Sequence, residues 1–238
     1  MRLALDTSTL TLSLALVDGA RVVEEVRIGP PKRQSEVLPG AITELLQKHG
    51  VKLEQLEGLV CGLGPGSFTG LRIGVATLKG LAWTLKKPLT GCGSLDALAL
   101  EGPEGVEVWA VAVVRKGELY RGRFRRTGDR VERLAEIDLL SVADFAAQLK
   151  ASTAKALGPA LDEYEKAFFE AGVNAAQLLA NPRVPSAACL EKLAPRLPYD
   201  EDALFAVEPT YLKGSGAEEN PKFPPLPGPP PTARMNSK

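Results

Sequence analysis

Histidine and cysteine are scarce in this chain of 238 residues, which contains one histidine and three cysteines. A zinc peptidase needs a cluster of His, Cys or carboxylate ligands, and a Ser/His/Asp triad would have to use His49 without any visible nucleophile elbow. The cysteines, Cys61, Cys92 and Cys189, are far apart and lie in apolar contexts. They fit no disulfide or zinc framework, and they predict reduced core residues of a cytoplasmic protein.

Net charge and long apolar runs are also missing. Lys and Arg together number 29, as do Asp and Glu, whereas a protein that grips nucleic acid alone is usually basic. Any contact with RNA is therefore expected to be local or shared with a partner. No apolar run approaches the roughly 20 residues of a membrane helix, and no secretory signal is visible at the first residues. The length is sufficient for two compact lobes.

The most distinctive stretch that is present runs from Gly62 to Gly74 and reads GLGPGSFTGLRIG. It follows an apolar run at 59–61 that predicts a buried strand, and it leads into a helical pattern that Ser67 can cap. Free amides at such a junction can bind an anion. The glycines can equally serve only to bring the helix close to the sheet, and spacing does not decide between these two interpretations. The Gly-Lys-Ser/Thr ending of a Walker A loop is absent.

The first 28 residues alternate apolar and polar positions, which predicts three antiparallel strands with a turn at Asp18-Gly19. The loop between the first two strands contains Asp6, Thr7, Ser8 and Thr9. These side chains can hold phosphate or Mg²⁺, although the residues alone favour simple satisfaction of turn amides.

Apolar periodicity predicts a helix that starts near Ser35 and a central helix through residue 85, each with one core-facing stripe. A short strand at 88–92 and a helix capped by Ser94 follow. The second half predicts a hairpin with strands at 106–114 and 118–125, helices at 141–150, 160–171 and 186–194, and a strand at 154–157.

The segments Gly64-Pro-Gly-Ser-Phe-Thr-Gly-Leu-Arg-Ile-Gly74 and Leu3-Ala-Leu-Asp-Thr-Ser-Thr9 together closely resemble the bacterial TsaB (YeaZ-type) family. The resemblance covers about the first hundred residues and resumes weakly at 115–120 and 209–213. It implies an α/β protein with the actin-like ATPase (ASKHA, ribonuclease H-like) fold, with two lobes that each contain a mixed sheet and flanking helices. The expected lobes are 1–102 and a smaller, divergent 103–213, followed by a proline-rich, disordered tail at 214–238.

The resemblance also implies a function. Family members are non-catalytic partners in the complex that places a threonylcarbamoyl group on the adenosine beside the anticodon of tRNA (position 37). They pair as homodimers, and with a catalytic TsaD-type paralogue that they activate, alongside a TsaE-type P-loop ATPase. ATP or ADP and Mg²⁺ could bind in the complex, and the resemblance leaves open whether nucleotide binds this chain. tRNA is expected only through the complex, and no catalytic or metal-binding residue is expected in this chain.

Two departures from the family pattern affect this interpretation. Gln34 stands where relatives often have His, and Val113 replaces the Asp of an Asp-x-Arg-x-x-Glu-x-Tyr pattern whose other positions are Arg115, Glu118 and Tyr120. Both changes remove groups that could hold metal or phosphate. They weaken the main alternative, an active actin-like ATPase or phosphotransferase that uses Asp6, Thr7, Thr9 and the 64–67 loop. A glycoprotease-type metallopeptidase is weaker still, because its ligands are missing.

Three sets of candidate site residues follow. A partner surface is expected on the two N-terminal helices, at Ser35, Leu38, Ile42, Gly70, Leu71, Gly74 and Leu78. A vestigial nucleotide or phosphate site is expected at Asp6, Thr7, Ser8, Thr9, Gly64, Gly66 and Ser67. The alternating residues Arg121, Arg123 and Arg125 form a basic stripe that could face RNA, or that could simply protect an edge strand.

Overall fold

The computed structural model describes residues 1–29 and 34–212, so the predictions for the proline-rich tail lie outside the described residues. The first of two sheets has the strand order β3-β2-β1-β4-β5. Strands β1 (Arg2–Asp6), β2 (Leu12–Asp18) and β3 (Arg21–Ile28) are antiparallel, as predicted. Strands β4 (Gly58–Gly62) and β5 (Leu89–Cys92) run parallel to β1. This is the strand order expected of an actin-like lobe.

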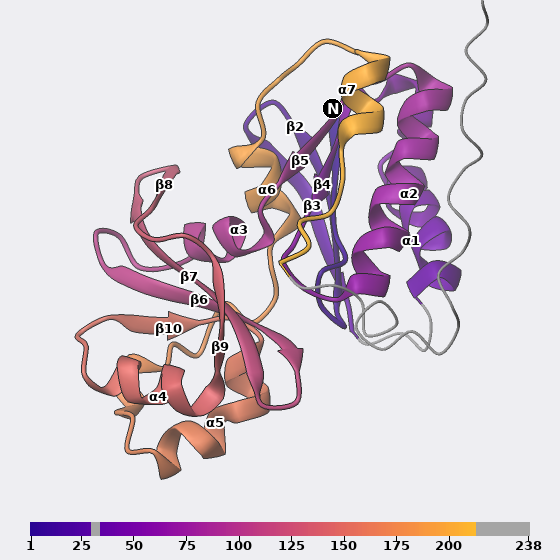
Figure 1. Cartoon of the computed structure of the whole chain (residues 1–238). Helices are drawn as coiled ribbons and strands as arrows, with labels where there is room; N and C mark the ends of the chain where they lie inside the picture. The colour runs from indigo at the N-terminus through magenta and orange to yellow at the C-terminus, as the bar shows by residue number, and fades with distance from the viewer. Residues whose placement is uncertain (30–33, 213–238) are drawn as a thin grey trace, which may run out of the picture.

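Helices cover both faces of this sheet, which explains why β1 and β4 are buried along their whole length. Leu3 and Leu5 pack with α1 (Gln34–Lys48) and α2 (Phe68–Leu85), which lie side by side in Figure 1. Ala4 points to the opposite face and packs with α3 (Ser94–Leu100) and α6 (Ala187–Leu193). Large residues on one face and small ones on the other follow from the two-residue period of a strand.

The second sheet is also mixed and has the order β10-β6-β7-β8, with β9 paired to β7. Its strands are β6 (Glu107–Arg115), β7 (Glu118–Thr127), β8 (Arg130–Arg133), β9 (Asp138–Ser141) and β10 (Lys155–Leu157). Helices α4 (Val142–Lys150) and α5 (Ala160–Glu170) pack on one face, and α3 packs on the other. Short 3₁₀ turns occur at Leu53–Gln55 and Ala175–Gln177. The predicted α/β class with two mixed sheets is confirmed.

The chain returns to the first sheet near its described end. Helix α6 packs against β1, β2 and β4, and α7 (Glu201–Ala206) packs against α2 (Figure 1). The prediction placed all residues from 103 to 213 in a second lobe, so its assignment of α6 and α7 is corrected here. The boundary near residue 102 itself stays a prediction.

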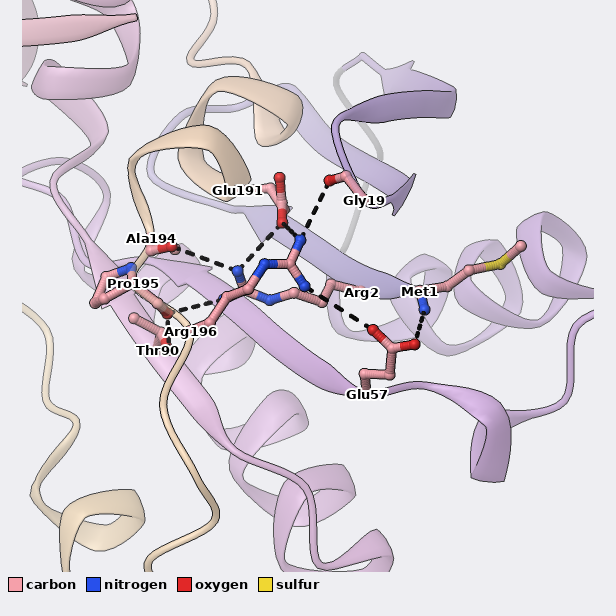
Figure 2. A network of polar contacts seen from close by, with 9 residues as sticks. All are labelled: Met1, Arg2, Gly19, Glu57, Thr90, Glu191, Ala194, Pro195 and Arg196. Atoms are coloured by element: carbon pink, nitrogen blue, oxygen red, sulfur yellow. Dashed lines mark hydrogen bonds and ion pairs between the residues drawn. The ribbon is translucent and has the colours of Figure 1, made fainter.

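A buried polar network fastens this return to β1 (Figure 2). The Arg2 guanidinium donates to Glu191 Oε1 at 3.2 Å and to the carbonyls of Ala194 and Pro195 at 3.4 Å. Arg196 donates to the same Glu191 oxygen and to the carbonyl of Gly19. Burial lowers the pKa of Arg2, while the charge of Glu191 acts in the opposite direction. Losing either member of such a pair would leave an uncompensated buried charge.

All three cysteines lie in the described part of the chain. The three cysteines are free, and burial raises the pKa of Cys92 and of Cys189 to about 11, so both thiols are protonated near neutral pH.

Within 1–29 and 34–212, no helix combines the length and apolar content that a membrane span requires.

Adjacent phenylalanines on α5 allow a test of the second core. The Phe168 side chain is fully buried and packs edge-on against Phe145, with their ring centres 5.9 Å apart, whereas Phe169 is 47% exposed. Phe168→Ala should lower the free energy of unfolding by about 3–5 kcal/mol, and Phe169→Ala by about 0.5 kcal/mol or less. Urea denaturation followed by circular dichroism measures both, and Phe168→Leu provides a milder variant if Phe168→Ala fails to fold. Equal losses at the two positions would contradict this packing.

Candidate functional site

The candidate site lies where two loops meet at the carboxyl ends of β1 and β4. The first loop, residues 7–11, joins β1 to β2, and the second, residues 63–67, joins β4 to α2. Because β1 and β4 are parallel, their carboxyl ends lie at the same edge of the sheet, the edge at which open α/β sheets place ligands.

Asp6 connects the elements around this edge. Its carboxylate is fully buried, and Oδ1 accepts hydrogen bonds from the Ser8 amide at 2.8 Å and the Ser8 hydroxyl at 2.6 Å. The Ser94 hydroxyl donates to Asp6 Oδ2 at 2.6 Å and accepts from the Gly64 amide at 3.0 Å. Burial raises the pKa of Asp6, and the bonds from Ser8 and Ser94 partly offset that rise. One carboxylate thus ties together β1, the glycine loop and the start of α3.

This arrangement explains the outcome of the predicted helix caps. Ser67 caps α2 as predicted, with its hydroxyl accepting from the Gly70 amide at 3.2 Å. Ser94 does not cap α3; Gly93 occupies the N-cap position, because the Ser94 hydroxyl is engaged with Asp6. Ser35 is the second residue of α1 rather than its cap.

Glycines bring α2 directly against the first loop. The Ser67 amide donates to the Ser8 carbonyl at 2.7 Å. A Cβ on Gly66 would collide with that carbonyl, one on Gly70 with the Thr7 carbonyl, and one on Gly74 with the Thr7 hydroxyl. These positions exclude side chains because two backbones touch. Of the two interpretations left open by the motif, close packing is the one that this contact supports.

Three of the hydroxyls around the two loops are already bonded within the chain. The hydroxyls of Ser8, Ser67 and Thr9 are bonded within the chain, the last to the Thr11 carbonyl at 2.7 Å. The Thr7 hydroxyl is buried against Gly74 without a partner. Across 1–29 and 34–212, no cluster of three or more His, Cys, Asp or Glu side chains could hold a metal. We therefore derive no chemical step from nucleotide or Mg²⁺ at these loops.

Gln34 joins the first loop to α1. Its amide nitrogen donates to the Thr9 carbonyl at 2.8 Å, and its amide oxygen lies beside Gly70 of α2. The family pattern marks Gln34 only by the absence of a histidine, so the sequence does not predict this role. Polar side chains at the start of a helix that faces a loop are the only signal that could have suggested it.

The residues chosen for the partner surface are mostly in the core. The structure buries five of the seven almost completely, within the core or against the first loop: Leu38, Ile42, Leu71, Gly74 and Leu78. Gly70 is buried against the Thr7 carbonyl, and only Ser35 is exposed. This choice of residues is corrected, because an apolar stripe that packs against its own sheet cannot also contact a partner.

The outer faces of α1 and α2 remain available. Thr43 and Gln47 are exposed on α1, as is Ala76 on α2. Gly40 and Gly80 lie within the two helices, and apart from the adjacent residues and the backbone of the helix itself, no atom of residues 1–29 and 34–212 lies within 4 Å of where their Cβ atoms would be. Glycine inside a helix costs about 1 kcal/mol relative to alanine, and packing within the described chain does not require it at these two positions.

The basic stripe on β7 is neutralised by neighbouring carboxylates. Arg121 makes a bidentate pair with Asp138 at 2.7 and 2.9 Å, and both Arg123 and Arg125 bind Glu107. β7 pairs with β6 on one side and with β8 and β9 on the other. The explanation that the stripe protects an edge strand is therefore wrong. Contact with RNA stays a prediction.

The strand order defines an actin-like, two-sheet protein in which the loops after β1 and β4 are hydrogen-bonded to each other. A family model described as "TsaD: tRNA N6-adenosine threonylcarbamoyltransferase" matches residues 31–181. Proteins named "tRNA threonylcarbamoyladenosine biosynthesis protein TsaB" are similar in sequence. The one from Bacillus subtilis (strain 168) is 33% identical over 150 residues, which is 62% of this chain and 65% of that protein. The one from Escherichia coli (strain K12) is 32% identical over 127 residues, 52% of this chain and 54% of that protein.

The solved structure "YeaZ from Pseudomonas aeruginosa" superposes with a TM-score of 0.71 at 24% identity, covering 89% of this chain and 99% of that chain. This likeness confirms the fold. The chain belongs to the TsaD family defined by that family model, in its TsaB (YeaZ-type) branch. The aligned segments span between half and two thirds of the length of these curated relatives.

Two glycines of α2 should respond oppositely to the same substitution. Gly74→Ala forces a methyl group against Thr7, so it should lower the free energy of unfolding by about 1–3 kcal/mol. Gly80→Ala places its methyl group in open space and should raise that free energy by up to about 1 kcal/mol. Urea denaturation measures both, and a change of the same sign in the two variants would refute the close contact at Gly74.

The raised pKa of Asp6 predicts a pH dependence with a definite sign. Since its folded pKa lies above the unfolded value of about 3.9, the stability that Asp6 contributes at low pH is lost as pH rises through the folded pKa. Wild type should therefore lose stability relative to Asp6→Asn as pH rises from about 3. Asp129 has a pKa lowered by Lys192, so the same comparison with Asp129→Asn should slope the other way. Parallel slopes in urea titrations would contradict the assignment.

Proposed function

We propose that this chain is the non-catalytic partner subunit in the synthesis of threonylcarbamoyladenosine on tRNA, and that it pairs with and activates a TsaD-type catalytic paralogue. The observation that carries the proposal is the closure of the two loops: Ser67 donates to Ser8, and Asp6 is engaged by Ser8 and Ser94. An active phosphotransferase built on these loops would need them to position phosphate, since such transfer consists mostly of positioning and charge neutralisation. Membership of the TsaB branch supports the same conclusion.

A partner would dock on the outer faces of α1 and α2. The exposed small residues Gly40, Ala76 and Gly80 allow another helix to approach closely. Related lobes can pair through equivalent helices, so the same surface would serve a homodimer of this chain and a heterodimer with the paralogue. The TsaE-type ATPase, ATP and tRNA would then be engaged through the complex rather than by this chain alone. The proposal places the chain in the cytoplasm.

A charge placed on that surface should break the complex. We expect the wild-type chain to elute as a homodimer in size-exclusion chromatography with light scattering, and to form a one-to-one heterodimer with the TsaD-type paralogue of the same organism. Ala76→Glu on α2 should weaken the heterodimer at least about tenfold, because it buries an unpaired carboxylate. Reconstituted threonylcarbamoylation of tRNA should fall in parallel.

Ala147→Glu is the matched control, because Ala147 is also exposed but lies on α4, against the second sheet. It should leave both measurements unchanged. An elution profile that is the same with and without the paralogue would refute the partner role, and equal effects of the two variants would refute the α1–α2 surface.

A further inference from the structure

Two segments that carry the family resemblance meet in space although they lie 139 residues apart in sequence. The Arg72 Nε atom, on α2, donates to the Tyr211 hydroxyl at 3.1 Å. The Thr210 amide donates to the Leu63 carbonyl at 2.8 Å, which fixes the backbone next to Tyr211. Neither the fold nor the closed loops account for this contact, because both side chains lie at the surface.

The guanidinium of Arg72 is held in place by aromatic rings. Its central carbon lies 3.9 Å from the centre of the Phe68 ring and 5.7 Å from that of Tyr211. The two rings are 5.0 Å apart and tilted by 40°. Stacking on Phe68 together with the Tyr211 bond restricts a side chain that is otherwise highly flexible. The conformational entropy that the Arg72 side chain would lose on binding a partner is therefore already largely lost in the free chain.

Arg72 has no acidic partner among the residues that the structure describes. Lys79, the other cation of α2, pairs with Glu208 at 2.7 Å, and Lys86 just after the helix pairs with Glu201 at 3.3 Å. For Arg72, the only hydrogen bond to a described residue is the one from Nε, so NH1 and NH2 remain available as a forked pair of donors.

We propose that Phe68, Arg72 and Tyr211 form a preorganised anchor that binds a carboxylate side chain of the protein partner. A guanidinium with two free terminal nitrogens matches a carboxylate in the planar, two-bond geometry. Arginine and tyrosine are also the residue types that dominate binding energy in protein interfaces. The anchor lies on α2 beside exposed Thr69, at one end of the outer face that carries Ala76. It rests on the proposed function, because the partner is taken to be the TsaD-type subunit.

The isolation of this cation favours a protein partner over RNA. Binding of a nucleic-acid backbone draws on several cations that neutralise successive phosphates. The other cation of α2, Lys79, is already paired with Glu208, whereas Arg72 lies against the aromatic rings of Phe68 and Tyr211, and both Tyr211 and the next residue, Leu212, are partly exposed, at 41% and 42%. A single guanidinium with two available terminal nitrogens, beside aromatic and apolar side chains, matches a single carboxylate on a protein surface.

Isothermal titration calorimetry of the full chain against the TsaD-type paralogue tests the anchor. Arg72→Gln should weaken binding by roughly 10- to 100-fold. Arg72→Lys should weaken it nearly as much, since an ammonium group offers neither the fork nor the stacking. Tyr211→Phe, which removes only the hydroxyl, should weaken it by about threefold. Arg130→Gln is the matched control: Arg130 is exposed on β8, and no ion pair joins it to another described residue.

The outcomes separate this inference from the proposed function. If wild type binds the paralogue and Arg72→Gln binds within twofold of it, the anchor is refuted and the partner role stands. If wild type itself shows no binding, the partner role fails and the anchor with it. Filter binding of tRNA to the same variants provides the remaining comparison: a loss of tRNA retention in Arg72→Gln with unchanged paralogue binding would assign the fork to a phosphate and overturn the proposal.

Discussion

The structure of the first lobe depends on one close contact, between the loop after β1 and the glycine-rich start of α2. Asp6 is fully buried and has no cationic partner in the described chain, so its hydrogen bonds to Ser8 and Ser94 are what make its burial tolerable. The Ser8 carbonyl of the same loop accepts from the Ser67 amide, at an approach that leaves no room for a side chain at position 66. The hydrogen bonds of the buried Asp6 carboxylate and the lack of space for a side chain at Gly66 therefore both favour the same position of the loop after β1.

The function that we propose lies on the helices rather than at this edge of the sheet. The Ser67 amide donates to the Ser8 carbonyl, and the Ser8 and Ser94 hydroxyls donate to Asp6, so these donors hold the two loops together. The remaining distinctive features of the lobe are on the outside: mid-helix glycines that the fold does not need, and a cation, Arg72, fixed by two aromatic rings. Both features suit a surface that recognises another protein.

Much of the fold could be predicted because its signals are local. Strand alternation indicated the antiparallel meander, and Ser67 before an apolar helix indicated a real cap. Ser94 shows the same local pattern but bonds to Asp6, a partner 88 residues away that no local rule reveals. Likewise, Leu38 and Leu78 belong to stripes that look alike whether they face a core or a partner. The carboxyl-end loops were predicted as a candidate site, whereas their closure depended on backbone contacts that residue types do not encode.

The return of α6 to the first sheet has a consequence for synthesis on the ribosome. Arg2 pairs with Glu191, 189 residues later in the chain, and Ala4 and Val60 are covered by Ala187 and Leu190. The part of this face that α6 covers, beside α3, therefore stays open to water until residues 187–193 have been synthesised. Contacts between such distant residues slow folding and expose intermediates to aggregation. The nascent first lobe is thus a natural client for a chaperone until its last helices arrive.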